Sequence, residues 1–149
     1  MAFLNIAGEW KESNGTMVNS AVAQLANEFG AMMFNLEHRF YGNSFPTKDL
    51  KSHNMIYLSS RQAVEDTANF IQKMSFKYNL RMWILFGCSY AATLVGLIKV
   101  KHPNLVAASV AYSAPWIAKA DFPEYYQVFS SGVLVLTKVH FTLPNSSCF

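Results

Sequence analysis

Charged residues and cysteines are both scarce in this sequence. Charged side chains make up 14% of its 149 residues, and the net charge is +3. The basic residues are scattered rather than gathered in a stripe, so nucleic-acid binding has little support. The two cysteines, Cys88 and Cys148, form neither a disulfide framework nor a metal-ligand pattern. We therefore expect no nucleic-acid partner, no metal and no other cofactor.

Long apolar runs are missing as well. Lys99 and Lys101 interrupt the most apolar helix candidate, so no membrane span is expected. No basic segment opens the chain as in a signal peptide, and residues 1–7 are more typical of a strand. Residues 142–149 are polar and aperiodic, which suggests a piece of a longer protein. Apolar residues are abundant, at 52%, which suits one domain with a sizeable core.

Short apolar segments alternate with segments of helical period along the chain. The strand candidates are Phe3–Ala7, Ala31–Leu36, Met82–Phe86 and Val106–Ala111. The helix candidates are Val18–Phe29, a helix capped by Ser59 that runs to Tyr78, and Ala91–Lys101. This alternation predicts an α/β fold, a mostly parallel sheet with helices on both faces. Such sheets bind ligands at the carboxyl ends of their strands.

The third strand candidate leads into the run Gly87-Cys88-Ser89-Tyr90-Ala91. A strand, a tight turn carrying a serine and a helix make up the nucleophile elbow of an α/β-hydrolase, which exposes the serine hydroxyl at the top of the sheet. The serine backbone is strained there, so the residues two before and two after it must be small, as Gly87 and Ala91 are. Ser89 is therefore a candidate nucleophile.

An oxyanion formed at this serine would need hydrogen-bond donors beside it. We expect the backbone N–H of Tyr90 to be one, and the backbone near Gly8 and Glu9, after the first strand, to supply another. The alternative is that Ser89 only caps the helix that follows it, since a Gly-x-Ser-x-small pattern also arises by chance. Both interpretations stay open at this point.

Six blocks of the sequence follow one another in a specific order. They are Leu36–Ser44 with Pro46, Tyr57–Ala63 with Asp66, Gly87–Tyr90, His102–Val106, Ser113–Pro115 and Asp121-Phe122. Together they resemble the serine peptidases that include lysosomal Pro-X carboxypeptidase, dipeptidyl peptidase II and thymus-specific serine protease. The run Glu37-His38-Arg39-Phe40-Tyr41-Gly42 is the most specific part of a resemblance that covers roughly residues 3 to 130.

The resemblance implies an α/β-hydrolase peptidase domain with a helical cap inserted later in the chain. It implies an exopeptidase that cuts proline-containing peptides by acyl-enzyme chemistry, with Ser89 as nucleophile and the Tyr90 backbone as oxyanion donor. A lysosomal or extracellular location is also implied. Whether the protein forms a homodimer is left open. The sequons at Asn14 and Asn145 are compatible glycosylation sites.

The sequence departs from the family pattern at several points. Cys88 and Ala92 stand where the family usually has glycine, and both are expected to crowd the elbow. Trp10 follows Gly8 and Glu9 where the family reads Gly-Glu-Gly, so it is expected to disturb the oxyanion hole. The acid and the histidine of the family's triad come far downstream, and this sequence stops before either.

Asp121 and His140 follow Ser89 in the order expected for an acid and a base. These groups should end two later strands, yet only one further strand candidate remains, near Val133–Leu136. We therefore reject this pair as the rest of a triad. Without a base a serine hydroxyl is a poor nucleophile, so the 149-residue chain alone is expected to lack useful peptidase activity.

Three polar residues of the most specific block are interpreted as structural groups near the site. His38 is expected to be hydrogen-bonded beneath it. Glu37 and Arg39 are expected to form an ion pair that stabilises the loop. His53 and His102 are expected to be ordinary loop residues.

Three classes of function remain. The first is a serine exopeptidase whose N-terminal part is residues 1–131, followed by a divergent tail at 132–149. The second is a non-catalytic interaction module or pseudo-enzyme that keeps half of the fold, which the departures at Trp10, Cys88 and Ala92 suit. The third is a lipase or esterase, which would share the elbow but not the block from Glu37 to Gly42.

Overall fold

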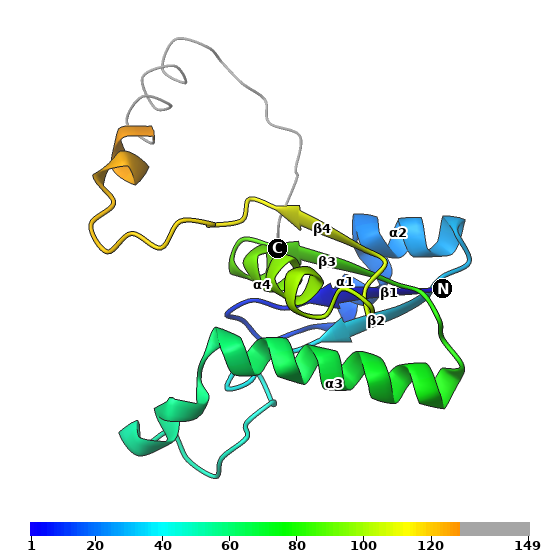
Figure 1. The fold of residues 1–149 in the computed structure, drawn as a ribbon, viewed down its shortest axis with the longest axis horizontal. Helices are drawn as coiled ribbons and strands as arrows, with labels where there is room; N and C mark the ends of the chain where they lie inside the picture. Colours follow the sequence, from blue (N-terminus) through cyan, green and yellow to red (C-terminus); the bar gives the residue numbers. More distant parts are fainter. Residues whose placement is uncertain (129–149) are drawn as a thin grey trace. The chain divides into compact units, whose positions relative to one another are not determined.

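The computed structural model describes residues 1–128 of the chain (Figure 1). They fall in two compact units, Met1–Pro115 and a second that begins at Trp116. The sheet and the candidate site belong to the first unit. Several features expected from the sequence lie outside the described residues, namely the tail at 132–149 with Val133–Leu136, His140, Asn145 and Cys148.

Four parallel strands form the sheet of the first unit. They are β1 (Ala2–Ile6), β2 (Met32–Leu36), β3 (Trp83–Cys88) and β4 (Ala108–Tyr112). Their order is β2-β1-β3-β4, so β1 and β3 are central while β2 and β4 lie at the edges. The predicted parallel sheet is confirmed, and the apolar segments marked every one of these strands.

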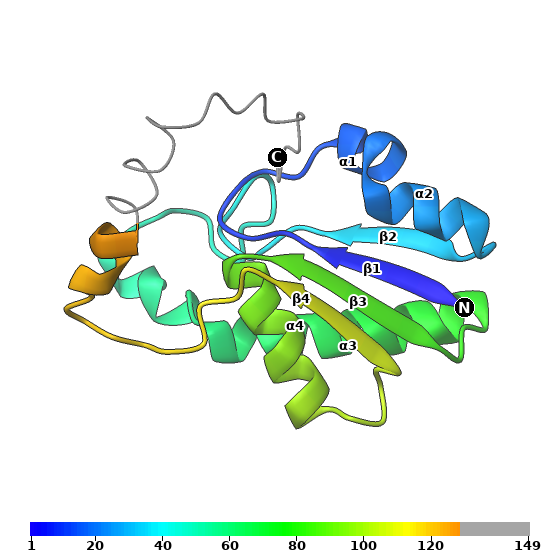
Figure 2. The ribbon, with the colours of Figure 1, turned by 90° about the horizontal axis from the view of Figure 1, so that it is seen from above.

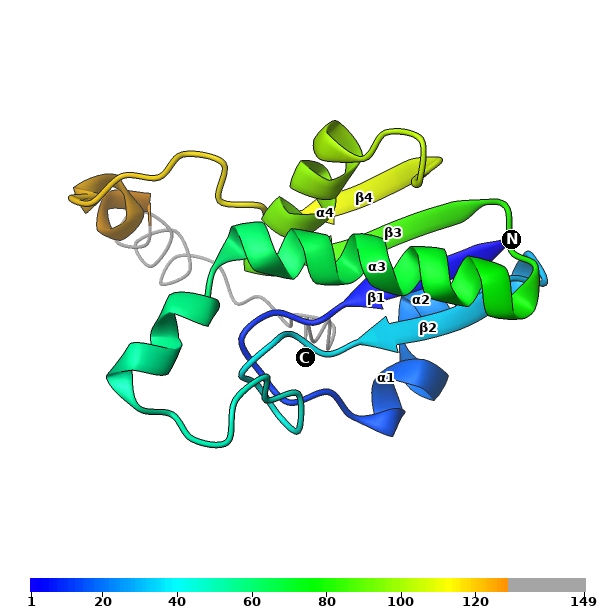
Figure 3. The ribbon, with the colours of Figure 1, turned by 60° about the horizontal axis from the view of Figure 1, so that its bottom comes forward.

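Helices cover both faces of this sheet (Figure 2). One face carries α1 (Asn14–Asn19) and α2 (Ala21–Glu28), and the other carries α3 (Ser60–Tyr78) and α4 (Tyr90–Lys101). A short 3-10 helix, η1 (Ser52–Tyr57), precedes α3, which lies along the sheet (Figure 3). No helix among residues 1–128 is long and apolar enough to cross a membrane.

The prediction of a single helix at Val18–Phe29 is wrong, because the structure has two helices that are separated at Ser20. Ser20 has an extended backbone, with φ −81° and ψ 157°, and it ends α1 while beginning α2. Its hydroxyl oxygen accepts a hydrogen bond from the Ala23 N–H at 3.1 Å. Serine is a favourable N-cap residue. The helical spacing of the apolar residues continues across Ser20, so that spacing could not reveal the division into two helices.

The larger part of the core lies between the sheet and α3 with α4. Alternate residues of the central strands, such as Leu4, Trp83 and Leu85, point to this face and are at most 1% exposed. They pack against Ile71 of α3 and Ile98 of α4, among others. A smaller cluster on the opposite face joins Phe3 and Phe86 to Val22 and Ala26 of α2. The central strands are thus buried on both faces, as parallel strands require.

The edge strand β4 is much less covered than β3. Val110, on the same face as its register partner Phe86, is 44% exposed, and Tyr112 is 40% exposed. Ser109 points the other way, where its hydroxyl donates to the Val95 carbonyl of α4 at 3.1 Å. An apolar edge strand of this kind favours association with other chains.

We predict that Val110→Lys raises the soluble fraction of the expressed chain and its temperature of aggregation, because the new charge lies on an open strand face. Ser109→Lys is the matched control. It places the same side chain against α4 and should lower both quantities. Equal harm from the two variants, measured by light scattering during heating, would show that the Val110 face is covered in solution.

Candidate active site

Ser89 occupies the turn between β3 and α4 with a strained backbone. Its φ is 55° and its ψ is −126°, a combination that costs a non-glycine residue on the order of 1–3 kcal/mol. A serine that caps a helix normally has an extended backbone and a hydroxyl that accepts from the helix N–H groups. Ser89 makes no capping hydrogen bond through its side chain, and the residue is exposed. Ser89 therefore holds the N-cap position of α4 without the side-chain hydrogen bond that the helix-cap alternative predicts.

The turn is tight because β3 and α4 approach each other closely at Gly87. A Cβ atom added to Gly87 would lie 2.4 Å from the carbonyl oxygen of Ala91. Ala91 and Ala92 are both completely buried beneath the turn. The Ser89 N–H donates to the Tyr112 carbonyl of β4 at 3.1 Å, and the Ser89 carbonyl accepts from the Ala92 N–H at 2.9 Å. The steric requirement for a small residue at position 87 is confirmed, and the full burial of Ala91 is consistent with the same requirement there.

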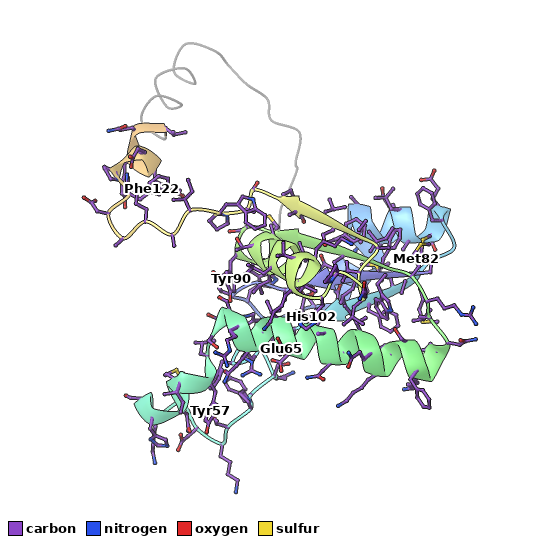
Figure 4. All side chains as sticks on the ribbon, in the orientation of Figure 1. Tyr57, Glu65, Met82, Tyr90, His102 and Phe122 are labelled. Carbon is purple, nitrogen blue, oxygen red and sulfur yellow. The ribbon has the colours of Figure 1, made fainter. Side chains whose placement is uncertain are left out.

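The side chain of Tyr90 ties the start of α4 to two other elements. Its hydroxyl is 2.8 Å from the Ser60 hydroxyl, at the start of α3, and 3.3 Å from Nε2 of His38. Figure 4 shows Tyr90 at the end of α4 that meets the beginning of α3. Burial raises the pKa of Tyr90 above its ordinary value, although the hydrogen bond with Ser60 works against this. The phenol therefore stays protonated and able to donate.

His38 is buried beside this phenol, at 5% exposed. Its Nδ1 lies 2.8 Å from the Arg39 carbonyl oxygen, and its ring packs against the rings of Tyr41 and Tyr90. The expectation of a hydrogen-bonded histidine at this level of the fold agrees with these contacts. His102 is bound elsewhere, to Glu65 at 3.3 Å, at the opposite end of α4 from Ser89.

The expected ion pair between Glu37 and Arg39 is wrong, because the two side chains turn to different partners. Arg39 forms a bidentate pair with Asp66 of α3, with N···O distances of 2.6 and 2.7 Å. It also donates to the Tyr57 carbonyl at 2.8 Å and to the Gln62 side chain at 2.7 Å. A planar guanidinium with five donors is suited to holding several acceptors at once.

Glu37 binds the neighbouring loops instead. It accepts hydrogen bonds from the Glu12 N–H at 3.1 Å, the Asn43 N–H at 2.8 Å and the Ser44 hydroxyl at 2.7 Å. Gly42 allows this approach, since its φ is +57° and a Cβ there would lie 1.7 Å from the Glu37 carboxylate. Burial alone would raise the pKa of Glu37, but the hydrogen bonds from Ser44, Asn43 and Glu12 hold it below its usual value.

The loop after β1 reaches the same edge of the sheet. Gly8 is buried, and the ring of Trp10 covers it so closely that a Cβ on Gly8 would lie 2.5 Å from the ring. Glu9 is exposed. A hollow of about 310 Å³ opens beside it and is lined by Glu9, His38, Tyr41, Leu58, Ser59, Ser60 and Tyr90. The loops after β1 and β2 and the starts of α3 and α4 therefore meet around this hollow.

Two members of this arrangement were missed from the sequence, the hydroxyls of Ser60 and Tyr90. Ser60 directly follows Ser59, the N-cap of α3. Serine is common at helix starts, so nothing singled this residue out in the sequence. The signal that could have pointed to the Tyr90 hydroxyl is the position of this tyrosine directly after the candidate nucleophile, Ser89. Asp121, rejected as a triad acid, lies in the second unit and is exposed.

Replacing Gly87 by alanine should move the elbow and lower the free energy of unfolding by about 1–3 kcal/mol, the usual cost of overpacking. Gly15→Ala in α1 is the control, since its added Cβ would be no closer than 3.5 Å to the Ser13 hydroxyl. That change should be neutral or slightly stabilising. Urea unfolding of both variants tests the close approach, and a Gly87→Ala variant as stable as the parent would contradict it.

The Glu37 carboxylate should make stability depend on acid pH. Because its folded pKa is lowered, its contribution is present above the unfolded value of about 4.5 and is lost as the pH falls through the folded value. We expect Glu37→Gln to be less stable than the parent near neutral pH and to lose less stability below pH ~4.5. Urea midpoints measured from neutral to acid pH decide this, and parallel curves for the two proteins would be the opposite outcome.

Comparison with known proteins gives a consistent family. A family model described as serine carboxypeptidase S28 matches residues 1–139. Mouse thymus-specific serine protease is 43% identical over 129 residues, covering 85% of this chain and 25% of that protein. Its human counterpart is 39% identical over 135 residues, covering 89% and 26%. Human lysosomal Pro-X carboxypeptidase is 33% identical over 97 residues, covering 61% and 20%.

The chain therefore spans about a quarter of the length of these thymus-specific relatives. The family match includes the strained serine turn, the block from Glu37 to Gly42 and the loop after β1. The sequence-based resemblance is confirmed. This chain belongs to the serine carboxypeptidase S28 family.

Proposed function

We propose that this chain is the N-terminal part of a serine peptidase with an α/β-hydrolase fold, and that Ser89 is its nucleophile. The observation that carries the proposal is the backbone of Ser89, strained at φ 55° between a buried parallel strand and a helix. Family membership supports serine peptidase chemistry. We propose residues 1–131 as the peptidase domain and residues 132–149 as a divergent tail, although the family match runs on to residue 139.

The proposed reaction is acyl transfer through a covalent intermediate. The Ser89 hydroxyl oxygen attacks the peptide carbonyl carbon while its proton passes to a histidine base, and the peptide nitrogen leaves with that proton. The backbone N–H of Tyr90 donates to the oxygen that becomes negative, and backbone near Gly8 and Glu9 supplies a second donor. Water then releases the acyl group.

The histidine base and its acid partner are proposed to come from outside residues 1–128. Within these residues His38 contacts Tyr90 and Arg39, His102 contacts Glu65, and His53 is exposed on η1. The thymus-specific relatives are about four times as long as the matched region. We therefore propose that the 149-residue chain is inactive alone, because most of the rate depends on a complete triad.

The names of two relatives support proposals about specificity and location. One of them is called a lysosomal Pro-X carboxypeptidase and another an extracellular serine carboxypeptidase. By this likeness we propose exopeptidase activity on proline-containing peptides and a lysosomal or extracellular location. Asn14 is proposed as a glycosylation site on that route.

A fluorophosphonate probe tests the nucleophile and the missing partners together. We expect no stoichiometric labelling of the 149-residue chain. A chimera of residues 1–128 followed by the remaining C-terminal part of human thymus-specific serine protease should label at one site. Mass spectrometry should place that label on Ser89, and Ser89→Ala should abolish it.

Each arm has a contrary result. Stoichiometric labelling of Ser89 in the 149-residue chain would show that the partners are already present. A chimera that folds, by its thermal transition, but stays unlabelled would reject Ser89 as the nucleophile.

A further inference from the structure

We propose that the side chains of His38 and Ser60 are positioning residues that hold Tyr90, and through it the backbone N–H beside Ser89, in place for the reaction. This inference rests on the proposed function. It is carried by a chain of hydrogen bonds from the Arg39 carbonyl through His38 and the Tyr90 hydroxyl to Ser60. The chain joins the loop after β2 to the first residues of α3 and α4.

The acceptors fix the direction of the hydrogen bonds. A carbonyl oxygen can only accept, so Nδ1 of His38 carries the proton and donates to Arg39 at 2.8 Å. In the neutral ring Nε2 is then an acceptor, and the Tyr90 hydroxyl donates to it at 3.3 Å. The Tyr90 oxygen in turn accepts from the Ser60 hydroxyl at 2.8 Å. Both ring nitrogens of His38 are therefore occupied, which makes it a positioning group rather than the base.

The first link of this chain is itself held firmly. The Arg39 carbonyl belongs to a residue whose guanidinium grips Asp66 at two points and also binds Tyr57 and Gln62. His38 is buried and its ring contacts the Tyr90 ring, with centroids 5.5 Å apart. The Tyr90 hydroxyl is thus bound to groups fixed by α3, not to a loose loop.

The consequence for catalysis follows from the place of Tyr90 in α4. It is the first residue of the helix, so its N–H has no acceptor within the helix. An oxyanion donor works only when it is aimed at the developing charge, and a small displacement loses much of its effect. Tethering the Tyr90 side chain limits rotation of the first turn of α4 and so keeps this N–H aimed beside Ser89.

The hydrogen bonds can be tested in the 149-residue chain itself. Long-range proton–nitrogen NMR of protein with isotope-labelled histidine nitrogens should show that the ring proton of His38 is on Nδ1. The signals of His38 are assigned by their loss in His38→Gln. Tyr90→Phe should shift the Nε2 resonance of His38, and Tyr78→Phe, which removes a phenol at the far end of α3, should not. A proton on Nε2, or no shift in Tyr90→Phe, would overturn the inference whether or not the protein is a peptidase.

The effect on the reaction is tested in the chimera. Tyr90→Phe should lower kcat about tenfold with little change in KM, because the donor acts mainly in the transition state. Ser60→Ala should lower kcat as well, and Ser60→Thr, which keeps the hydroxyl, should restore it. Tyr78→Phe should leave kcat unchanged.

The active fraction, counted by fluorophosphonate titration, separates positioning from folding. A loss confined to the number of labelled molecules, with parental kcat for each of them, would show a purely structural role and overturn the inference. A chimera in which the parent does not label at all would reject the proposed function, and the NMR result would then decide the hydrogen-bond chain alone.

Discussion

The strained backbone of Ser89 is the constraint on which the rest of the site depends. A non-glycine residue at φ 55° persists only when its surroundings leave it no relaxed alternative. Here β3 is held between β1 and β4, the Ser89 N–H is bound to Tyr112, and α4 is packed against the sheet by fully buried residues. Because residue 87 is glycine, it has no side chain that would hold α4 away from β3. The strain is thus maintained by β3 between its two neighbouring strands and by the close packing of α4.

The block from Glu37 to Gly42 has a physical reason at each polar position. The three residues that follow β2 bind three different parts of the fold. Glu37 accepts hydrogen bonds from the loops on either side, His38 is hydrogen-bonded to Tyr90, and Arg39 pairs with Asp66 of α3. Phe40, buried with φ 68°, and Gly42, with φ +57°, bend the chain so that this is achievable.

The sequence was sufficient for the features that depend on local pattern. Short apolar segments located the four described strands, Ser59 capped α3 as expected, and the small residues around Ser89 marked the turn. Pairing between side chains was not accessible in this way. Arg39 finds Asp66 across 27 positions and Tyr90 finds Ser60 across 30, so neighbours in the chain gave the wrong partner for Arg39. Ser20 divided a helix that apolar period alone joined.

The hydrogen bonds of His38 also limit where a base for Ser89 can come from. A general base must keep one ring nitrogen free to take the serine proton, and its other nitrogen is normally oriented by an acceptor. His38 has the orienting acceptor, the Arg39 carbonyl, but its second nitrogen is turned to a phenol that burial keeps protonated. To serve as the base it would have to release Tyr90, and so loosen the N–H that we propose as the oxyanion donor. The two roles exclude each other, and the geometry of residues 1–128 favours positioning.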